Sequence, residues 1–211
     1  YSGAGLRHLL QRVAEQLDPE QSDACLRQMV VTGHSQGGLL TKLTAVDTGD
    51  RLWNAVARKP LDEVSLSSAT RDILRAALFL EPLPFVRRVV FIATPHRGSY
   101  QALRSISGWV TRFVRLPGRL LNSAGELATL QTDGIIVATN VRGLPTSIDN
   151  MREGNPFLMT LAGIPVVPGV ARHSIIPVLG DGPVEDGKDG VVAYRSAHLE
   201  DADSELVVQS A

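Results

Sequence analysis

Short apolar runs alternate with helical segments along this chain, and the alternation limits the folds that it can adopt. Four runs have the composition of buried strands, at residues 29–31, 89–93, 174–179 and 204–208. Segments with helical spacing or helix signals lie around them, at residues 5–17, 37–47, 69–80 and much of 102–131. This pattern predicts a parallel sheet with helices on both faces. In such α/β folds, functional groups gather at the carboxyl ends of the strands.

Composition and charge exclude several classes of protein. The 211 residues contain 22 acidic and 21 basic side chains, so no global positive field attracts nucleic acid. The basic residues Arg112, Arg115 and Arg119 stand among apolar residues and are typical of a solvated helix face. A single cysteine excludes an internal disulfide, and no Cys/His group has zinc spacing. No apolar run is long enough to span a bilayer.

The segment Gly33-His34-Ser35-Gln36-Gly37-Gly38 has the strongest chemical content. It follows a predicted strand and opens a predicted helix, which is the context of a G-x-S-x-G nucleophile elbow. The turn would lift the Ser35 hydroxyl out of the sheet in an uncommon backbone conformation, and the flanking glycines Gly33 and Gly37 would let strand and helix approach. The backbone N–H of Gln36 would face a developing oxyanion. The alternative is a glycine-rich turn that only packs well.

With this elbow the chain resembles the lipases and esterases of the α/β-hydrolase superfamily. The segment Phe91-Ile92-Ala93-Thr94-Pro95-His96-Arg97-Gly98-Ser99 resembles the strand and turn that follow the elbow helix in bacterial lipases. Asp189-Gly190-Val191-Val192, with Ser196-Ala197-His198-Leu199 after it, resembles their acid loop and the next short helix. The resemblance covers most of the chain from residue 27 onward, except roughly 100–145.

The resemblance implies an α/β-hydrolase fold, with a mostly parallel sheet flanked by helices and a helical lid insertion. Residues 1–100 would form the first part of the hydrolase core, 101–160 the lid or cap, and 161–211 the second part. In the lid, Trp109, Phe113 and Leu116 fall at helical spacing and make one apolar stripe. The stripe would either line a pocket above Ser35 or simply pack on the core.

The triad order Ser, Asp, His places the acid just past the third strand. Asp181, Glu185, Asp186 and Asp189 are the candidates there. The resemblance selects Asp189, with Asp181 in reserve. The same carboxylates could hold a calcium ion, although their spacing matches no calcium motif. We therefore expect no metal and no cofactor.

The histidine base is the difficulty. Only His198 follows Asp189, and it precedes the last strand, whereas the family keeps its base after that strand. We expect His198 to belong to the short helix, with the base beyond Ala211 and His198 as a fallback. His34 is expected to pack in the elbow, His96 to brace its turn through hydrogen bonds, and His173 to be a satisfied structural residue.

Only 32 residues precede Gly33. We therefore expect a second oxyanion donor before Tyr1, and we expect the elbow strand to lie at an edge of the sheet. The chain is thus expected to be truncated at both ends.

The reading that these residues favour is a serine carboxylic-ester hydrolase that works through an acyl-enzyme. Its partner would be a small-molecule or lipid ester, because the apolar helices favour an acyl or aromatic ester. These helices are also compatible with contact at a membrane surface. Two alternatives stay open: a non-catalytic hydrolase-fold binding module, and an acyltransferase or lipid-remodelling hydrolase on the same fold.

Overall fold

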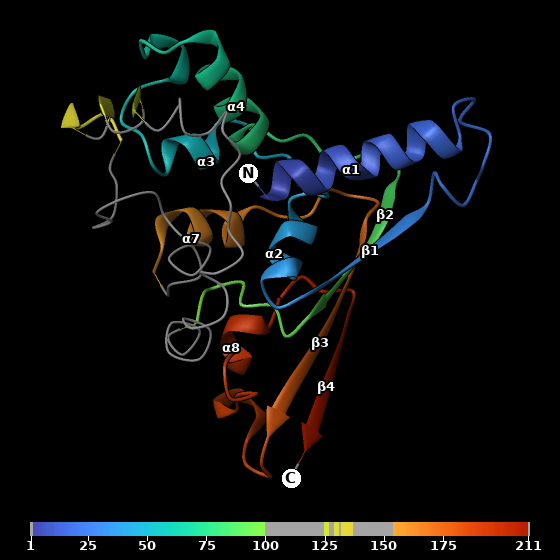
Figure 1. The fold of residues 1–211 in the computed structure, drawn as a ribbon. Coiled ribbons are helices and arrows are strands. Elements are labelled where there is room, and N and C mark those ends of the chain that lie inside the picture. Colours follow the sequence, from blue (N-terminus) through green and yellow to red (C-terminus); the bar gives the residue numbers. More distant parts are fainter. Residues whose placement is uncertain (1, 100–124, 127–128, 131, 137–153, 211) are drawn as a thin grey trace.

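Four parallel strands form one sheet in the order β1-β2-β3-β4 (Figure 1). The structure is a computed structural model that describes residues 2–99, 125–126, 129–130, 132–136 and 154–210. The strands are β1 (Met29–His34), β2 (Val86–Ile92), β3 (Ala171–Leu179) and β4 (Ser204–Ser210). The predicted α/β class with a parallel sheet is confirmed. β1 forms one edge of the described sheet, as the sequence predicts for the elbow strand.

The helices begin and end largely where the sequence signals place them. The elements are α1 (Ser2–Leu17), α2 (Gln36–Lys42), α3 (Arg51–Asn54), α4 (Ser68–Leu78), α7 (Pro156–Gly163) and α8 (Tyr194–Ala197), with 3₁₀ turns η1 (Leu61–Glu63) and η4 (Val184–Asp186). Asn155 caps α7 by accepting a hydrogen bond from the backbone N–H of Leu158 at 3.2 Å. Pro156 takes the first turn of that helix, where no hydrogen-bond donor is needed.

Helix α2 is shorter than the predicted helix over 37–47. Beyond Lys42 the backbone takes tertiary partners: Thr44 accepts from the N–H of Leu83 at 2.8 Å, and Ala45 accepts from Val167 at 2.9 Å. The Thr44 hydroxyl also donates to the carbonyl of Thr41 at 2.7 Å. Local side-chain bonding of this kind competes with helix continuation. These partners lie far away in the sequence, so periodicity could not locate the helix end.

The described helices cover one face of the sheet. Along β1, Val31 and Gly33 are buried, whereas Val30 on the opposite face is 53% exposed. Leu206 and Val208 on β4 are likewise 57% and 46% exposed, on the face opposite Val207, which packs in one cluster with Tyr194 and Ala197 of α8. The sequence predicts helices on both faces, because the strands are apolar at nearly every position. In the part of the chain that the structure describes, burial alternates with the two-residue period of a one-sided sheet.

A second, smaller core lies beside the sheet. Trp53, Leu61 and Val64 pack together there with Leu130, which is 4% exposed. The backbone N–H of Arg58 donates to Ile135 at 2.9 Å and continues this contact. The few described residues of 125–136 therefore pack on the segment between α2 and β2. Residues 154–160 of the proposed lid are also described, and α7 begins there at Pro156. Trp109, Phe113 and Leu116 lie outside the described residues, and the division at 1–100, 101–160 and 161–211 stays a prediction.

Among the described residues, we find no helix with the length and apolarity that crossing a membrane requires.

Candidate active site

Ser35 occupies a strained turn between β1 and α2. Its backbone has φ 53° and ψ −127°, a region that non-glycine residues rarely adopt. The N–H of Ser35 donates to the carbonyl of Ile92 at 2.8 Å, and its own carbonyl accepts from Gly38 at 3.0 Å. The neighbouring strand and the following helix thus hold the turn from both sides. The predicted uncommon backbone conformation at this serine is confirmed.

Glycine is required at two positions around this turn, and only one of them, Gly33, belongs to the pair that the sequence predicts. A Cβ on Gly33 would lie 2.4 Å from the carbonyl oxygen of Gly37, and a Cβ on Gly38 would lie 1.8 Å from the Thr94 hydroxyl oxygen. A Cβ on Gly37 would meet nothing within 4 Å. The required pair is therefore Gly33 and Gly38. The motif letters do not reveal this, because the critical neighbour of Gly38 comes from the turn after β2.

The Ser35 side chain is half-buried and makes no hydrogen bond to any described residue, including the backbone of α2. Gln36 follows it as the first residue of α2 and is also half-buried. A hydroxyl that does not cap its own helix keeps its lone pairs and its proton for another partner. The turn therefore offers the Ser35 oxygen to a group outside α2.

Asp189 lies in the loop that follows β3 and is bound to that loop by its own backbone. One carboxylate oxygen, Oδ1, accepts from the N–H of Val191 at 2.8 Å and from the N–H of Val192 at 2.6 Å. The N–H of Leu179 donates to the carbonyl of Lys188 at 2.9 Å, which fixes the loop to the end of β3. With Oδ1 occupied, Oδ2 is the oxygen that accepts no hydrogen bond from the described residues.

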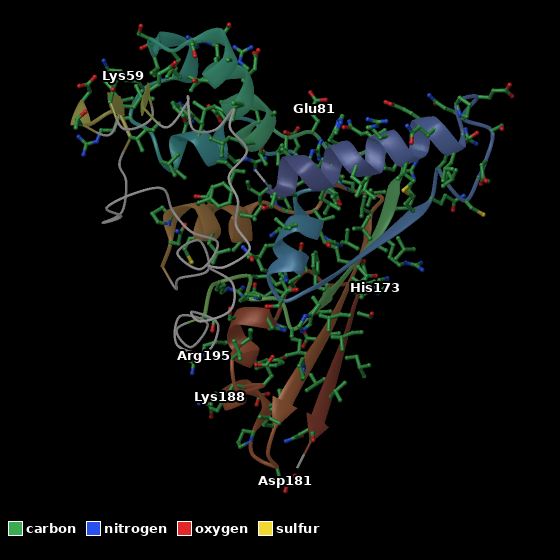
Figure 2. All side chains as sticks on the ribbon, viewed as in Figure 1. Lys59, Glu81, His173, Asp181, Lys188 and Arg195 are labelled. Carbon is green, nitrogen blue, oxygen red and sulfur yellow. The ribbon has the colours of Figure 1, made fainter. Side chains whose placement is uncertain are left out.

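The other candidate acids are exposed. Asp181, Glu185 and Asp186 face solvent, whereas Asp189 is half-buried. Figure 2 shows Asp181 at the outer end of the loop, farther from α8 than Lys188. In the described part of the chain, no group of three or more His, Cys, Asp or Glu residues could hold a metal ion, so the calcium alternative gains no support.

The acid loop packs beside the elbow helix. Val191, two residues after Asp189, packs against the small cluster formed by Leu39 of α2 and Leu158 of α7. The hydroxyl of Ser99 donates to the carbonyl of Val191, so the turn after β2 joins the same contact. The parallel strands β1, β2 and β3 thus bring their following loops together. The helix that follows Ser35 and the loop that contains Asp189 are therefore in contact, although the two residues are 154 positions apart in the sequence.

No described residue hydrogen-bonds to both Ser35 and Asp189, and none of the chain's five histidines bonds to either. His198 follows α8 as its C-cap, as predicted, and its Nδ1 lies 2.8 Å from Glu205 Oε2. His173 Nδ1 lies 2.7 Å from the Ser204 hydroxyl, but its Nε2 is buried without a partner among the described residues, so the predicted satisfied histidine is only half satisfied. His34 is exposed on β1, so the predicted packing role is not observed.

His96 is the correction among the histidines. We predict from the sequence that it braces its turn through hydrogen bonds, but neither ring nitrogen has a partner among the described residues, and the residue is 1% exposed. Its ring instead meets Phe91 edge-on, with 4.8 Å between ring centres. Burial, together with the nearby charges of Lys42 and Arg97, lowers the pKa of His96 to about 3. The imidazole is therefore neutral at physiological pH and acts by packing.

Sequence reasoning missed Lys42, a buried cation on α2. Its Nζ donates to the carbonyl of Ala162 at 3.0 Å, and the residue is 3% exposed. Burial lowers the pKa of Lys42 to about 8, with Asp201 acting in the opposite direction and Arg97 adding to the effect. The sequence signal was weak: a single lysine at the end of an otherwise apolar and small-residue helix.

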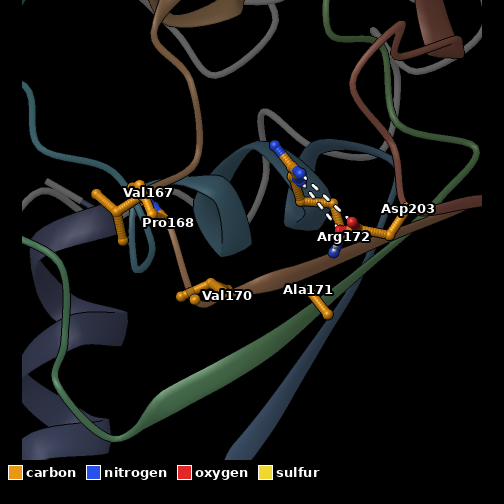
Figure 3. A pocket seen from close by; sticks show the side chains of 7 residues that line it. Val167, Pro168, Val170, Ala171, Arg172 and Asp203 are labelled. Carbon is orange, nitrogen blue, oxygen red and sulfur yellow. Dashed lines mark hydrogen bonds and ion pairs between the residues drawn. The ribbon is translucent and has the colours of Figure 1, made fainter.

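A shallow groove of about 310 Å³ lies at the amino end of β3, away from Ser35 (Figure 3). Arg172 lines it, but its guanidinium is already paired with Asp203 at 3.1 Å and with Asp201 at 3.0 Å. These carboxylates also raise the pKa of Arg172, the hydrogen bond to Asp203 contributing most. Because the cation is satisfied and the groove lies at the wrong end of the strands, it is not the candidate active site.

Among known proteins, only solved structures are similar to this chain, and that similarity is weak. No protein-family model and no curated protein matches the chain. The mature form of Bacillus licheniformis lipase BlEst2 is similar at 15% identity and a TM-score of 0.48, over 99% of this chain and 65% of that one. Its propeptide form gives 14% identity and a TM-score of 0.47, over 98% of this chain and 35% of that one. The chain thus spans less than two thirds of either structure.

Proposed function

We propose that this chain forms the core of a serine carboxylic-ester hydrolase, with Ser35 as the nucleophile. The observation that carries the proposal is the Ser35 turn: a serine at φ 53° between a parallel strand and a helix, with its hydroxyl uncommitted among the described residues. Structures maintain strained non-glycine residues where a side chain must be presented in one direction. The Asp189 loop beside α2 supports the same proposal.

In the proposed reaction the Ser35 oxygen attacks the ester carbonyl while a histidine takes the hydroxyl proton. The backbone N–H of Gln36 donates to the oxyanion of the tetrahedral intermediate. Collapse of that intermediate releases the alcohol, which receives the proton from the histidine and leaves an acyl group on Ser35. Water then repeats the sequence and releases the acid. Asp189 orients the imidazole and stabilises its cationic form through Oδ2.

The base of this proposal is a histidine. His198, the fallback base, directs its Nδ1 to Glu205, so Asp189 is not its orienting carboxylate in the described structure. Histidine substitutions in the full-length gene product are the direct way to assign the base. The substrate class that we propose is an acyl or aromatic ester, with no cofactor and no metal.

The test is hydrolysis of a panel of p-nitrophenyl esters by the full-length gene product and its Ser35→Ala variant. We expect the variant to lose on the order of 10³-fold in kcat or more, and to lose labelling by a fluorophosphonate. Near-full turnover by Ser35→Ala would end the serine mechanism. Adding an alcohol acceptor and measuring the new ester distinguishes a transferase from a hydrolase.

A second function is favoured by one observation: no described histidine hydrogen-bonds to Ser35 or Asp189. A hydrolase-fold module that binds a partner without catalysis would have this arrangement. Absence of both ester turnover and fluorophosphonate labelling in the full-length gene product would favour this module over the enzyme.

A further inference from the structure

A tyrosine, a histidine and a glutamate form a hydrogen-bonded cluster between α8 and β4. The Tyr194 hydroxyl donates to Glu205 Oε1 at 2.7 Å, and His198 Nδ1 lies 2.8 Å from Glu205 Oε2. The two rings stack, with centres 5.3 Å apart and planes inclined by 20°. Each carboxylate oxygen of Glu205 therefore holds one end of the same short helix. We name these three residues the α8 clamp.

The α8 clamp is chemically distinct from the proposed triad. Glu205 comes from β4, and its side chain is 19% exposed. The hydrogen bond to Glu205, with burial and the charges of Glu205 and Glu185, raises the pKa of Tyr194 to about 12. The tyrosine thus remains a hydrogen-bond donor over the whole range in which an esterase is assayed. No hydrogen bond connects the clamp side chains to Ser35 or Asp189 within the described residues.

The clamp controls the acid loop through the first residue of α8. The backbone N–H of Tyr194 donates to the carbonyl of Gly187 at 2.9 Å, and Lys188 pairs with Ala193 in a short bridge. These two contacts close the loop that contains Asp189. Tyr194 is thus held by Glu205 through its side chain and by Gly187 through its backbone, so it connects the α8 clamp to the acid loop.

The same helix also fixes the turn after β2. The Ser196 hydroxyl donates to the carbonyl of Gly98 at 2.6 Å, and the Arg97 guanidinium donates to the carbonyl of His198 at 2.7 Å. The turn in question packs on Gly38 of the elbow helix through Thr94. Helix α8 therefore connects the acid loop to the elbow, and the α8 clamp is its attachment to the sheet.

We propose that Glu205 is a positioning residue that sets the place of the Asp189 carboxylate through Tyr194 and His198. The inference rests on the proposed function, since it assigns Asp189 a place in a triad. The competing explanation is that the clamp only contributes stability to the domain. The two explanations differ in what a variant does to the acid loop relative to the rest of the sheet.

The first experiment is amide hydrogen exchange on the full-length gene product and its Glu205→Ala variant. The reporters are the N–H groups of Val191 and Val192, which donate to Asp189, with β2 amides as the reference for global opening. We expect the protection of the two reporters to fall about tenfold relative to β2. Glu205→Gln should keep it, because its amide can accept from Tyr194 and donate to His198.

The matched control is Asp203→Ala, two residues before Glu205. It removes the ion pair with Arg172 at 3.1 Å but touches no residue of α8. It should lower the protection of the reporters and of β2 alike. If Glu205→Ala gives this same uniform loss, the clamp is only a stability element and the proposal is overturned. Tyr194→Phe, which removes the hydrogen bonds of the Tyr194 hydroxyl to Glu205 at 2.7 Å and to His198 Nδ1 at 3.3 Å, repeats the test if Glu205→Ala does not fold.

The second experiment is the pH profile of ester hydrolysis. We expect Glu205→Ala to lower kcat about tenfold with little change in KM, because a displaced carboxylate orients the base less well. The acid limb of kcat/KM should move to lower pH, because Asp189 would stabilise the imidazolium less. Glu205→Gln should restore both. Ser35-dependent activity with an unchanged kcat and acid limb in Glu205→Ala overturns the positioning role alone. Lost reporter protection without any Ser35-dependent activity overturns the proposed function and leaves the coupling of Glu205 to the loop in place.

Discussion

Two consecutive strands of the sheet end in the same backbone device and use it differently. Ser35 after β1 has φ 53°, and Ala93 after β2 has φ 48°. The first turn leaves a half-buried hydroxyl without a hydrogen bond to any described residue. The second turn places Thr94 and His96 at 1% exposure each. A positive φ at a strand end therefore leaves a serine hydroxyl without a described partner in one turn and supports packing in the other.

A hydrogen bond and a packing contact join the two turns, so the conformation of one depends on the other. The backbone N–H of Ser35 donates to Ile92, immediately before Ala93, and Gly38 lies against Thr94. The open turn depends on the packed one for its shape. We call the Ser35 turn with the Asp189 loop the open side, and the turn after β2 the packed side. Substitutions on the open side should change the rate of ester hydrolysis with little effect on the free energy of unfolding. Substitutions on the packed side should mainly change the free energy of unfolding.

The largest effect is expected on the open side, at Asp189. Asp189→Asn keeps an oxygen for the N–H groups of Val191 and Val192 but removes the charge. We expect kcat for ester hydrolysis to fall by on the order of 10²–10³-fold while the melting temperature stays within about 2 °C. Asp181→Asn is the control, because Asp181 is the exposed reserve acid. A loss of activity in the Asp181 variant alone would reassign the acid.

The next effect concerns the contact between the turns. Gly38→Ala puts a Cβ 1.8 Å from the Thr94 hydroxyl oxygen, which is buried and cannot move away easily. We expect a loss of about 3 kcal/mol in the free energy of unfolding, measured by urea denaturation. Gly37→Ala on the same helix has open space and should gain up to about 1 kcal/mol. Equal effects of the two variants would show that the turns do not interlock.

This pair of glycines also marks what a sequence can reveal. The strands, the parallel sheet and the helix cap at Asn155 follow from local patterns, because burial period, β-branched residues and capping signals act over a few residues. The roles of Gly38 and His96 depend on residues from other elements that pack on them. Apolar residues on a strand do not specify which face is covered, so the sequence could not indicate that the helices of the described part of the chain lie on one face of the sheet.

Lys42 on α2 provides a pH test of the buried surroundings of the packed turn, because its charge acts on His96 in that turn. Its pKa is lowered from 10.5 to about 8 in the folded protein, so the folded state binds fewer protons than the unfolded state between those pH values. Stability therefore rises with pH in this window; below pH 8 the full cost of the buried charge is present. We expect the stability difference between wild type and Lys42→Met to change by roughly 3 kcal/mol across the window. A constant difference would place the Lys42 ammonium in a solvated environment.

The smallest expected effect is the difference in stability between the glycine variants of the two positive-φ residues, Ser35 and Ala93. A glycine relieves the strain of about 1–2 kcal/mol but loses about 0.5–1 kcal/mol through the entropy of the unfolded chain. For half-buried Ser35 the balance is a gain of up to about 1 kcal/mol in Ser35→Gly, together with loss of ester hydrolysis. Ala93 is 4% exposed, so Ala93→Gly also loses a buried methyl group worth about 0.8 kcal/mol and should be near neutral or slightly destabilising. Thermal unfolding of the two variants measures the difference directly. If Ala93→Gly gained as much stability as Ser35→Gly, the strain at Ala93 would be unsupported by packing, and the contrast between an open and a packed turn would not hold.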